Sequence, residues 1–239
     1  LFPSAAFHGS IYSGNSRGIA AEFPVTESPL HVNITHHFTT NMPAESHQTT
    51  LILASTSPYR RLLLERLGIP FDVVAPETDE TPRPGEAPEA LAARLADEKA
   101  LAVAGRFPQA VVIGSDQVAV HAGRIIGKPG TAGQARRQLA SFSGNKVVFL
   151  SAFSLHRLAD GFRHAASVET EVVFRDLTDE EIRRYVERDK PVDCAGGFRS
   201  EATGSALLRA MNSCDPTAII GLPLIAVSEG LRRAGLRVP

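Results

Sequence analysis

The 239-residue chain has no tryptophan, two cysteines and two methionines, and aromatic residues make up only 6% of it. Two cysteines, Cys194 and Cys214, cannot form the disulfide framework of a small secreted protein, and so low a count is typical of a reducing compartment. No apolar run approaches the roughly 18 residues that a membrane span requires. The sequence therefore predicts a cytoplasmic protein with no membrane partner.

An excess of charge of either sign is also lacking. The 25 lysines and arginines face 26 aspartates and glutamates, which gives a formal net charge of -1. A protein that binds nucleic-acid polymers usually carries a basic excess, so we expect no such partner. The hydrophobic share of 43% and charged share of 21% are those of an ordinary folded globule.

The first fifty residues differ in composition from the rest. They hold one basic residue, Arg17, and five of the eight histidines, and their apolar residues follow neither a strand nor a helix period. Such a segment buries little apolar area, so we predict a disordered or extended tail over residues 1–48 and a folded domain over 49–239. Because Met42 comes just before the first convincing strand, we expect the natural chain to start there.

The remaining sequence alternates strand and helix patterns, which predicts an α/β fold with mixed strands in one sheet. Helix 88–105 should bury Leu91, Leu95 and Ala102, and strand 110–114, apolar throughout, should be central with Asp116 at its end. The expected strands are 50–54, 71–74, 110–114, 147–158 and 166–175, and the expected helices are 59–68, 88–105, 131–141, 178–188 and 222–235.

The segment 55–61, Ser-Thr-Ser-Pro-Tyr-Arg-Arg, joins the first strand to the first helix. Free backbone N–H groups and the dipole at a helix N-terminus favour an anion, and Arg60 and Arg61 add forked donors suited to phosphate oxygens. The same pattern also fits a capped helix with solvated arginines. Spacing alone leaves the two interpretations open.

Charged residues elsewhere suit a polyphosphate and a metal. A carboxylate such as Asp116, beside a buried strand, can hold a divalent cation or orient a water. Glu80 could support the metal, and Lys99 and Lys128 could clamp phosphates, although most such charges are merely solvated.

The segment 194–201, Cys-Ala-Gly-Gly-Phe-Arg-Ser-Glu, combines small residues with an acid. Small residues let a flat ligand approach the backbone, and Glu201 offers two acceptor oxygens beside it. On the pattern alone, a tight turn with an exposed acid is the favoured explanation. Cys194 and Cys214 are expected to be core thiols, because neither has a histidine partner nearby.

Taken in order, these motifs resemble the Maf family of nucleoside triphosphate pyrophosphatases. The resemblance runs from about Thr50 to Arg237. Each motif is short, but their order and spacing together are highly specific. They are Ser55–Arg61, Glu98-Lys99-Ala100, Gly114–Val118, Gly127-Lys128-Pro129, Cys194-Ala195-Gly196 and Gly221–Leu224.

The resemblance implies hydrolysis of the bond between the α and β phosphates with magnesium or manganese. It implies a twisted mixed sheet flanked by helices, with two lobes around a deep cleft as in inosine triphosphatases, and a homodimer. Asp116 would accept a proton from water and, with Glu80, hold the metal. The substrate-binding residues would be Ser55, Ser57, Tyr59, Arg60, Arg61, Lys99, Gln117, Lys128 and Glu201.

Three of these positions distinguish branches of the family. The branch that hydrolyses dTTP and UTP tends to have arginine, threonine and glutamine where this chain has Tyr59, Gln117 and Glu201. The 7-methyl-GTP branch tends to have tryptophan, glutamine and glutamate, so this chain looks like that branch. The alternatives are a dTTP/UTP pyrophosphatase and a nucleotide-binding regulator of septum formation.

Overall fold

A computed structural model describes residues 50–239, and the predicted tail and the expected start at Met42 lie outside the described residues. No helix in the described part is both long and apolar enough to span a membrane. The strands are β1 (Leu51–Ala54), β2 (Asp72–Val74), β3 (Val111–His121), β4 (Arg124–Ile126), β5 (Lys146–Arg157), β6 (Phe162–Phe174) and β7 (Leu208–Ser213). The α-helices are α1 (Pro58–Glu65), α2 (Pro88–Ala104), α3 (Ala132–Phe142), α4 (Asp179–Asp189) and α5 (Leu224–Arg233).

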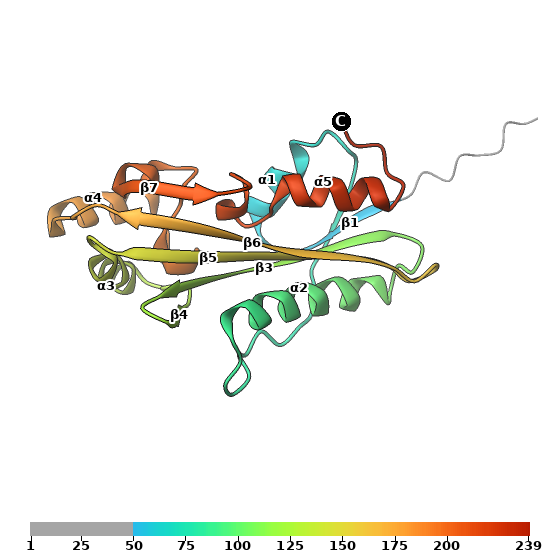
Figure 1. The fold of residues 1–239 in the computed structure, drawn as a ribbon, viewed down its shortest axis with the longest axis horizontal. Helices are drawn as coiled ribbons and strands as arrows, with labels where there is room; N and C mark the ends of the chain where they lie inside the picture. Colours follow the sequence, from blue (N-terminus) through green and yellow to red (C-terminus); the bar gives the residue numbers. More distant parts are fainter. Residues whose placement is uncertain (1–49) are drawn as a thin grey trace, which may run out of the picture. The chain divides into compact units, whose positions relative to one another are not determined.

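The seven strands form one mixed sheet in the order β2-β1-β3-β5-β6-β7, and β4 pairs with β3 (Figure 1). β1 runs parallel to β2 and β3, and every other pair is antiparallel. β5 and β6 form a long hairpin whose turn contains Asp160 and Gly161, in the interval between the expected strands 147–158 and 166–175. The predicted α/β class, a mixed sheet flanked by helices, is confirmed.

β3 is longer than the sequence suggested. It was expected to end at Gly114, with Asp116 following it, but it continues to His121. What ends near Gly114 is the parallel pairing with β1, whose last register pair is Ala54 with Gly114. Beyond that pair β3 continues against β5, so Asp116 lies mid-strand, just past the point where its parallel neighbour stops.

The inner strands are buried on both faces, as their uninterrupted apolar runs predict. On one face Leu51 and Leu53 pack against α1 and α5, and on the other Ile52 packs against α2. α2 buries Leu91 and Leu95 as expected, but the prediction for Ala102 is wrong because that residue is exposed. The C-terminal half of α2 instead turns small residues and a valine to the sheet, namely Ala96, Ala100, Val103 and Ala104.

The other half of the sheet is covered by α3 and α4 (Figure 1). Thr178 and Glu181 form the capping box at the start of α4: the Glu181 N–H donates to the Thr178 hydroxyl, and the Glu181 carboxylate accepts from the Thr178 N–H. Two short strands, β4 and β7, were not predicted because each is brief and mostly exposed, with little apolar alternation. The division into two lobes stays a prediction.

Candidate active site

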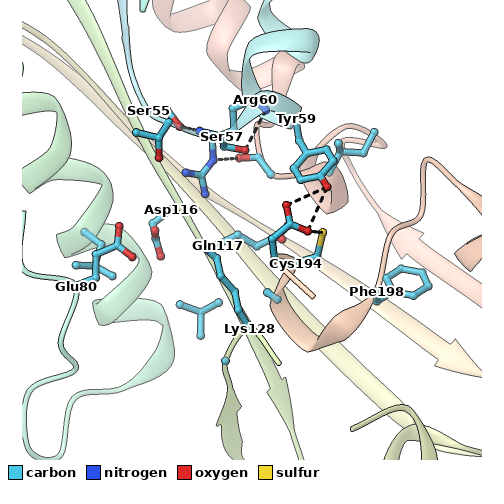
Figure 2. Close-up of a pocket in the computed structure, with 18 of the residues that line it drawn as sticks. Ser55, Ser57, Tyr59, Arg60, Glu80, Asp116, Gln117, Lys128, Cys194 and Phe198 are labelled. Carbon is cyan, nitrogen blue, oxygen red and sulfur yellow. Dashed lines mark hydrogen bonds between the residues drawn. The ribbon is translucent and has the colours of Figure 1, made fainter. Parts of the chain in front are cut away.

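A pocket of about 490 Å³ opens on the sheet where the parallel pairing of β1 with β3 ends (Figure 2). It receives residues from the start of α1, the loop before α2, the middle of β3, the segment after β4 and the loops around residues 194 and 220. Among the predicted site residues, those that line it are Ser55, Ser57, Tyr59, Arg60, Glu80, Lys99, Asp116, Gln117, Lys128 and Glu201.

A close approach between α2 and β3 sets one end of the pocket. A Cβ on Gly114 would lie 2.2 Å from the backbone oxygen of Ala96 and 2.4 Å from the backbone nitrogen of Ala100, so this position requires glycine. The helix can therefore lie directly on the strand. In the same turn of α2, between Ala96 and Ala100, the buried side chain of Lys99 reaches Asp116.

Lys99 joins two carboxylates at this end. Its ammonium nitrogen lies 2.6 Å from Oδ1 of Asp116 and 2.6 Å from Oε1 of Glu80. Burial would raise the pKa of Glu80, but the hydrogen bond and charge of Lys99, with smaller contributions from Lys128 and Arg60, lower it below its usual range. Glu80 therefore faces the pocket as a carboxylate, and Asp116 contacts the same ammonium group.

The loop that carries Glu80 is held by Arg94 of α2. The Arg94 guanidinium donates to both carboxylate oxygens of Glu86 at 2.7 and 2.8 Å, to Glu98 at 3.0 Å and to the backbone oxygen of Thr81 at 3.2 Å. Arg94 and the backbone N–H of Arg83 lower the pKa of Glu86 to about 2. This set of contacts fixes the loop next to Glu80. Arg94 was not identified from the sequence, because its role depends on these tertiary contacts.

The start of α1 has the form that an anion site requires. The Ser57 hydroxyl caps the helix by accepting from the Arg60 N–H at 3.4 Å, and the Ser55 hydroxyl accepts from the Ser57 N–H at 3.1 Å. Each hydroxyl keeps its own hydrogen for donation to a ligand. The two serines and the positive end of the helix thus border the pocket from one side.

Arg60 connects this helix start to the acids. Its Nε–H donates to the backbone oxygen of Gly221 at 3.0 Å, and the buried hydroxyl of Ser115 donates to the same oxygen at 3.0 Å. Gly221 adopts φ 120°, where other residues are disfavoured. Burial lowers the pKa of Arg60, and the nearby charges of Asp116 and Glu80 oppose that shift. The basic turn of α1 and the acid of β3 therefore share one pocket (Figure 2).

Arg61 and Lys128 differ in position. Arg61 forms an exposed ion pair with Glu65 at 2.9 Å and is not among the residues that line the pocket, so the structure does not bring it to the other predicted residues. Lys128 is exposed at the pocket and makes no ion pair within residues 50–239. It is therefore available to an anionic ligand.

The opposite end of the pocket is formed by Tyr59 and the loop around residue 194. The Tyr59 hydroxyl donates to Asp193, 3.3 Å from Oδ1 and 3.2 Å from Oδ2. Burial, with Cys194 and Asp193 adding to it, raises the pKa of Tyr59, and burial raises the pKa of Cys194 to about 12. Both groups stay protonated, and the thiol of Cys194 lies 3.5 Å from Oδ1 of Asp193.

Neither cysteine is a core thiol, so that prediction is wrong. Cys194 is half-buried at the pocket, and Cys214 is exposed. The small residues around Cys194 produce the difference, because the turn at Gly196, with φ 64°, brings this loop over β3. Cys214 follows β7, the edge strand, where one side of the chain meets solvent.

Glu201 and Tyr59 are linked by Arg199. The Arg199 Nε–H donates to Glu201 Oε1 at 3.1 Å, and the guanidinium carbon lies 5.0 Å from the centre of the Tyr59 ring. Tyr59 and Glu201 line the pocket, whereas Arg199 does not, so Arg199 supports both from behind. Sequence reasoning missed Arg199 and Asp193, and only their positions next to Cys194 and Glu201 pointed to them.

Gln117 is held by the protein itself. Its amide nitrogen donates to the Ser151 hydroxyl at 2.9 Å and to the backbone oxygens of Ala218 and Ile219 at 3.0 and 2.9 Å. Only its carbonyl oxygen is then available to a ligand. Gln117 also ties the short helix Ala218–Ile220, next to Gly221, to the sheet.

The residues at the acid end fit a divalent cation. Within residues 50–239 no three His, Cys, Asp or Glu side chains gather as metal ligands. The two carboxylates of Asp116 and Glu80 nevertheless meet at one point, since both contact the Lys99 ammonium. Mg²⁺ is commonly held by one or two carboxylates and completed by phosphate oxygens and water, so this donor set suits it.

Known proteins match this chain over the part that forms the fold and the pocket. A family model described as Maf-like protein matches residues 50–234. The chain is 52% identical over 189 residues to the 7-methyl-GTP pyrophosphatase of Aromatoleum aromaticum, covering 79% of this chain and 97% of that protein. It is 54% identical over 189 residues to the 7-methyl-GTP pyrophosphatase of Xanthomonas campestris pv. campestris, covering 79% and 98%.

Among solved structures, the Ham1 protein of Staphylococcus aureus is similar over 54% of this chain and 73% of that chain. The sequence identity is 16% and the TM-score is 0.39. The sequence matches, by contrast, extend from β1 to α5 and include every element that contributes to the pocket.

Proposed function

The chain belongs to the Maf family, and from this we propose that it hydrolyses 7-methyl-GTP to 7-methyl-GMP and pyrophosphate. The relatives that share about half of its residues bear the name of that activity, and they match over nearly their whole length. The observation in the structure that supports hydrolysis is the shared pocket of Asp116 and the basic start of α1. A phosphate-binding turn beside a carboxylate is what attack by water on a phosphorus requires.

In this proposal Asp116 accepts the proton of the attacking water. Its Oδ1 is held by Lys99 at 2.6 Å, which fixes the carboxylate and leaves Oδ2 to orient the water. The water attacks the α-phosphorus in line with the bond to the β-phosphate. The bridging oxygen leaves with the electron pair of that bond as part of pyrophosphate, and the new oxygen remains on the monophosphate.

The cations of the pocket hold the phosphates. Arg60 and the Ser55 and Ser57 hydroxyls lie at the start of α1, and Lys128 lies across from them at the mouth. Charge-assisted hydrogen bonds from these groups strengthen as negative charge moves onto the leaving group. Since Arg61 faces away, we assign it no contact with the phosphates.

We propose that Asp116 and Glu80 hold Mg²⁺ or Mn²⁺ next to the phosphates. A divalent cation there would supply positive charge that polarises the phosphoryl oxygens and lowers the barrier to attack. Lys99 contacts both carboxylates, so it orients them for this role. A homodimer and a cytoplasmic location remain predictions from the sequence.

The guanine ring is assigned to the Tyr59 end of the pocket. The ring of Tyr59 offers a stacking face, and the Glu201 carboxylate can accept from the ring N–H and the amino group of guanine. Thymine and uracil lack the amino group and would leave one acceptor site of Glu201 without a donor from the base, at a cost of about 1–3 kcal/mol. The pocket therefore favours guanine over the substrates of the dTTP/UTP branch.

The test is a panel of 7-methyl-GTP, GTP, dTTP and UTP with detection of pyrophosphate in the presence of Mg²⁺ or Mn²⁺. We expect the highest kcat/KM for 7-methyl-GTP. A higher kcat/KM for dTTP and UTP than for 7-methyl-GTP would identify the chain as a dTTP/UTP pyrophosphatase. Tight binding of all four nucleotides without release of pyrophosphate would favour a nucleotide-binding regulator.

A further inference from the structure

The pocket must distinguish 7-methyl-GTP from GTP, and Glu201 is poorly suited to that task. Both bases present the same ring N–H and amino group, so Glu201 can pair equally with either. Methylation changes the charge, because the 7-methylguanine ring is cationic. The charge of Glu201 is already met by Arg199, whose Nε lies 3.1 Å from Oε1. The Glu201–Arg199 ion pair therefore presents little net charge to the bound base.

Asp193 and Glu201 are the two acids at the Tyr59 end of the pocket, and Asp193 is the one that forms no ion pair among residues 50–239. It lines the same pocket as Tyr59 and Glu201. Its neighbours are the Tyr59 hydroxyl, 3.2 Å from Oδ2, and the Cys194 thiol, 3.5 Å from Oδ1, which are both neutral donors. Among residues 50–239 no lysine, arginine or histidine makes an ion pair with Asp193. Its negative charge is therefore uncompensated.

The backbone next to Asp193 is fixed. The carbonyl of Val192 accepts from the Gly130 N–H at 2.9 Å, and the N–H of Gly196 donates to the Gly127 carbonyl at 3.4 Å. These bonds join the loop to the segment after β4. The carboxylate is thus held beside the hydroxyl end of the Tyr59 ring.

We propose that Asp193 is a specificity-determining residue whose carboxylate recognises the positive charge of the methylated base. This inference rests on the proposed function and deepens it. Tyr59 and Glu201 select guanine, and the uncompensated charge of Asp193 favours the cationic ring over the neutral one. The Tyr59 hydroxyl, which donates to Asp193, orients the carboxylate at the edge of the stacking face.

The test compares 7-methyl-GTP with GTP in the wild type and in Asp193→Asn. The substitution keeps the shape and the acceptor for Tyr59 and removes the charge. We expect kcat/KM for 7-methyl-GTP to fall about fivefold, mainly through KM, and that for GTP to stay constant or rise, since Asp193 is exposed and partly screened. Asp72→Asn, an exposed acid outside the pocket, is the matched control and should leave both values unchanged.

Tyr59→Phe separates a charge effect from an indirect effect on the ring. It removes the hydroxyl but leaves the charge of Asp193, so we expect both substrates to lose affinity while their ratio changes by less than in Asp193→Asn. If the ratio of kcat/KM for 7-methyl-GTP to that for GTP fell equally in the two variants, Asp193 would act only by holding Tyr59. That result would overturn the inference.

Equilibrium binding of 7-methyl-GMP and GMP, measured by calorimetry, makes the result independent of turnover. We expect the wild type to bind 7-methyl-GMP more tightly than GMP, and Asp193→Asn to lose about fivefold of that preference. An unchanged preference in Asp193→Asn would overturn the role of Asp193 even if the enzyme hydrolyses 7-methyl-GTP. Failure of the wild type to hydrolyse 7-methyl-GTP, with the binding preference intact, would instead contradict the proposed function.

Discussion

The ammonium nitrogen of Lys99 lies 2.6 Å from Oδ1 of Asp116, and this contact joins α2 to β3 at the floor of the pocket. The side chains are 5% and 11% exposed, so neither charge is well solvated. A buried charge needs its partner, because removal of one leaves the other desolvated. The pair therefore fixes the carboxylate that we assign to the proton of the attacking water.

Asp116→Asn tests that assignment. The amide keeps the size of the side chain and can still accept from Lys99, which also retains Glu80, so the fold should persist. An amide cannot take up a proton, and loss of a general base typically costs about 10²- to 10⁴-fold in kcat. Pyrophosphate release gives the rate and thermal unfolding checks the fold. A folded variant with the wild-type rate would remove Asp116 from the mechanism.

Glu201→Gln tests the recognition of guanine. The amide offers one acceptor oxygen in place of two, and Arg199 loses its ionic partner, so preference for 7-methyl-GTP over UTP should fall about tenfold. Glu229→Gln, an exposed acid on α5 away from the pocket, is the control and should change nothing. Steady-state kinetics on both nucleotides measure the ratio. The same selectivity in Glu201→Gln and wild type would contradict this part of the account.

Arg94→Gln tests how the loop that carries Glu80 is held. The substitution removes the bidentate ion pair with Glu86 and the hydrogen bonds to Glu98 and to the backbone oxygen of Thr81. Glu80 should then be less well placed, and we expect kcat/KM to fall about fivefold to tenfold with a higher requirement for Mg²⁺. Titration of the cation at fixed 7-methyl-GTP measures this. Arg137→Gln on α3 is the control, and an equal effect there would argue against a role of the loop.

Gly114→Ala tests the close approach of α2 and β3. The added Cβ would meet backbone atoms of Ala96 at 2.2 Å and Ala100 at 2.4 Å, which no side-chain rotation can relieve. We expect the free energy of unfolding to fall by about 1–3 kcal/mol or more, together with loss of activity. Gly133→Ala, in the first turn of α3 with no close neighbour, should be neutral or slightly stabilising. Urea unfolding of the two variants makes the comparison, and equal stabilities would contradict the packing argument.

The stability of the wild type should depend on pH through Asp97. Burial would raise the pKa of Asp97, but hydrogen bonds from His156 at 2.8 Å, Ser154 at 2.7 Å and Arg163 at 3.1 Å lower it below the ordinary value of about 3.9. The folded state therefore binds this proton less readily than the unfolded state. The stabilisation is present above the ordinary pKa and is lost as pH falls through the lowered one.

Urea unfolding of the wild type and of Asp97→Asn between pH 7 and pH 3 measures this dependence. We expect a constant difference in the free energy of unfolding above about pH 5 and a smaller one as pH falls below about 4. A difference that stays constant to pH 3 would show that the charge of Asp97 contributes nothing.

Much of the fold follows from local patterns. The apolar run 110–114 predicted a central strand, and the helix expected over 178–188 is α4, which begins at Asp179 after the capping residue Thr178. The sequence did not predict that β3 continues to His121, because Ser115, Asp116 and Gln117 interrupt its apolar run. Those polar side chains are accommodated mid-strand by tertiary partners: Lys99 for Asp116, and backbone oxygens for Ser115 and Gln117.

The site was predicted unevenly for the same reason. The predicted site residues, such as Arg60 and Lys128, line the pocket with the exception of Arg61, which forms an ion pair with Glu65 outside it. Asp193 and Arg199 could not be assigned from sequence, because their importance depends on contacts with Tyr59, which lies more than a hundred residues away in the chain. Whether a charged side chain can attract a ligand depends on the ion pairs that the fold gives it, and these are not visible in the sequence.

Hydrolysis of 7-methyl-GTP in water enriched in ¹⁸O tests the central claim most directly. If water held at Asp116 attacks the α-phosphorus, mass spectrometry will find the label in 7-methyl-GMP and none in the pyrophosphate. Label in pyrophosphate, or release of inorganic phosphate with 7-methyl-GDP, would place the attack on another phosphorus and contradict the account.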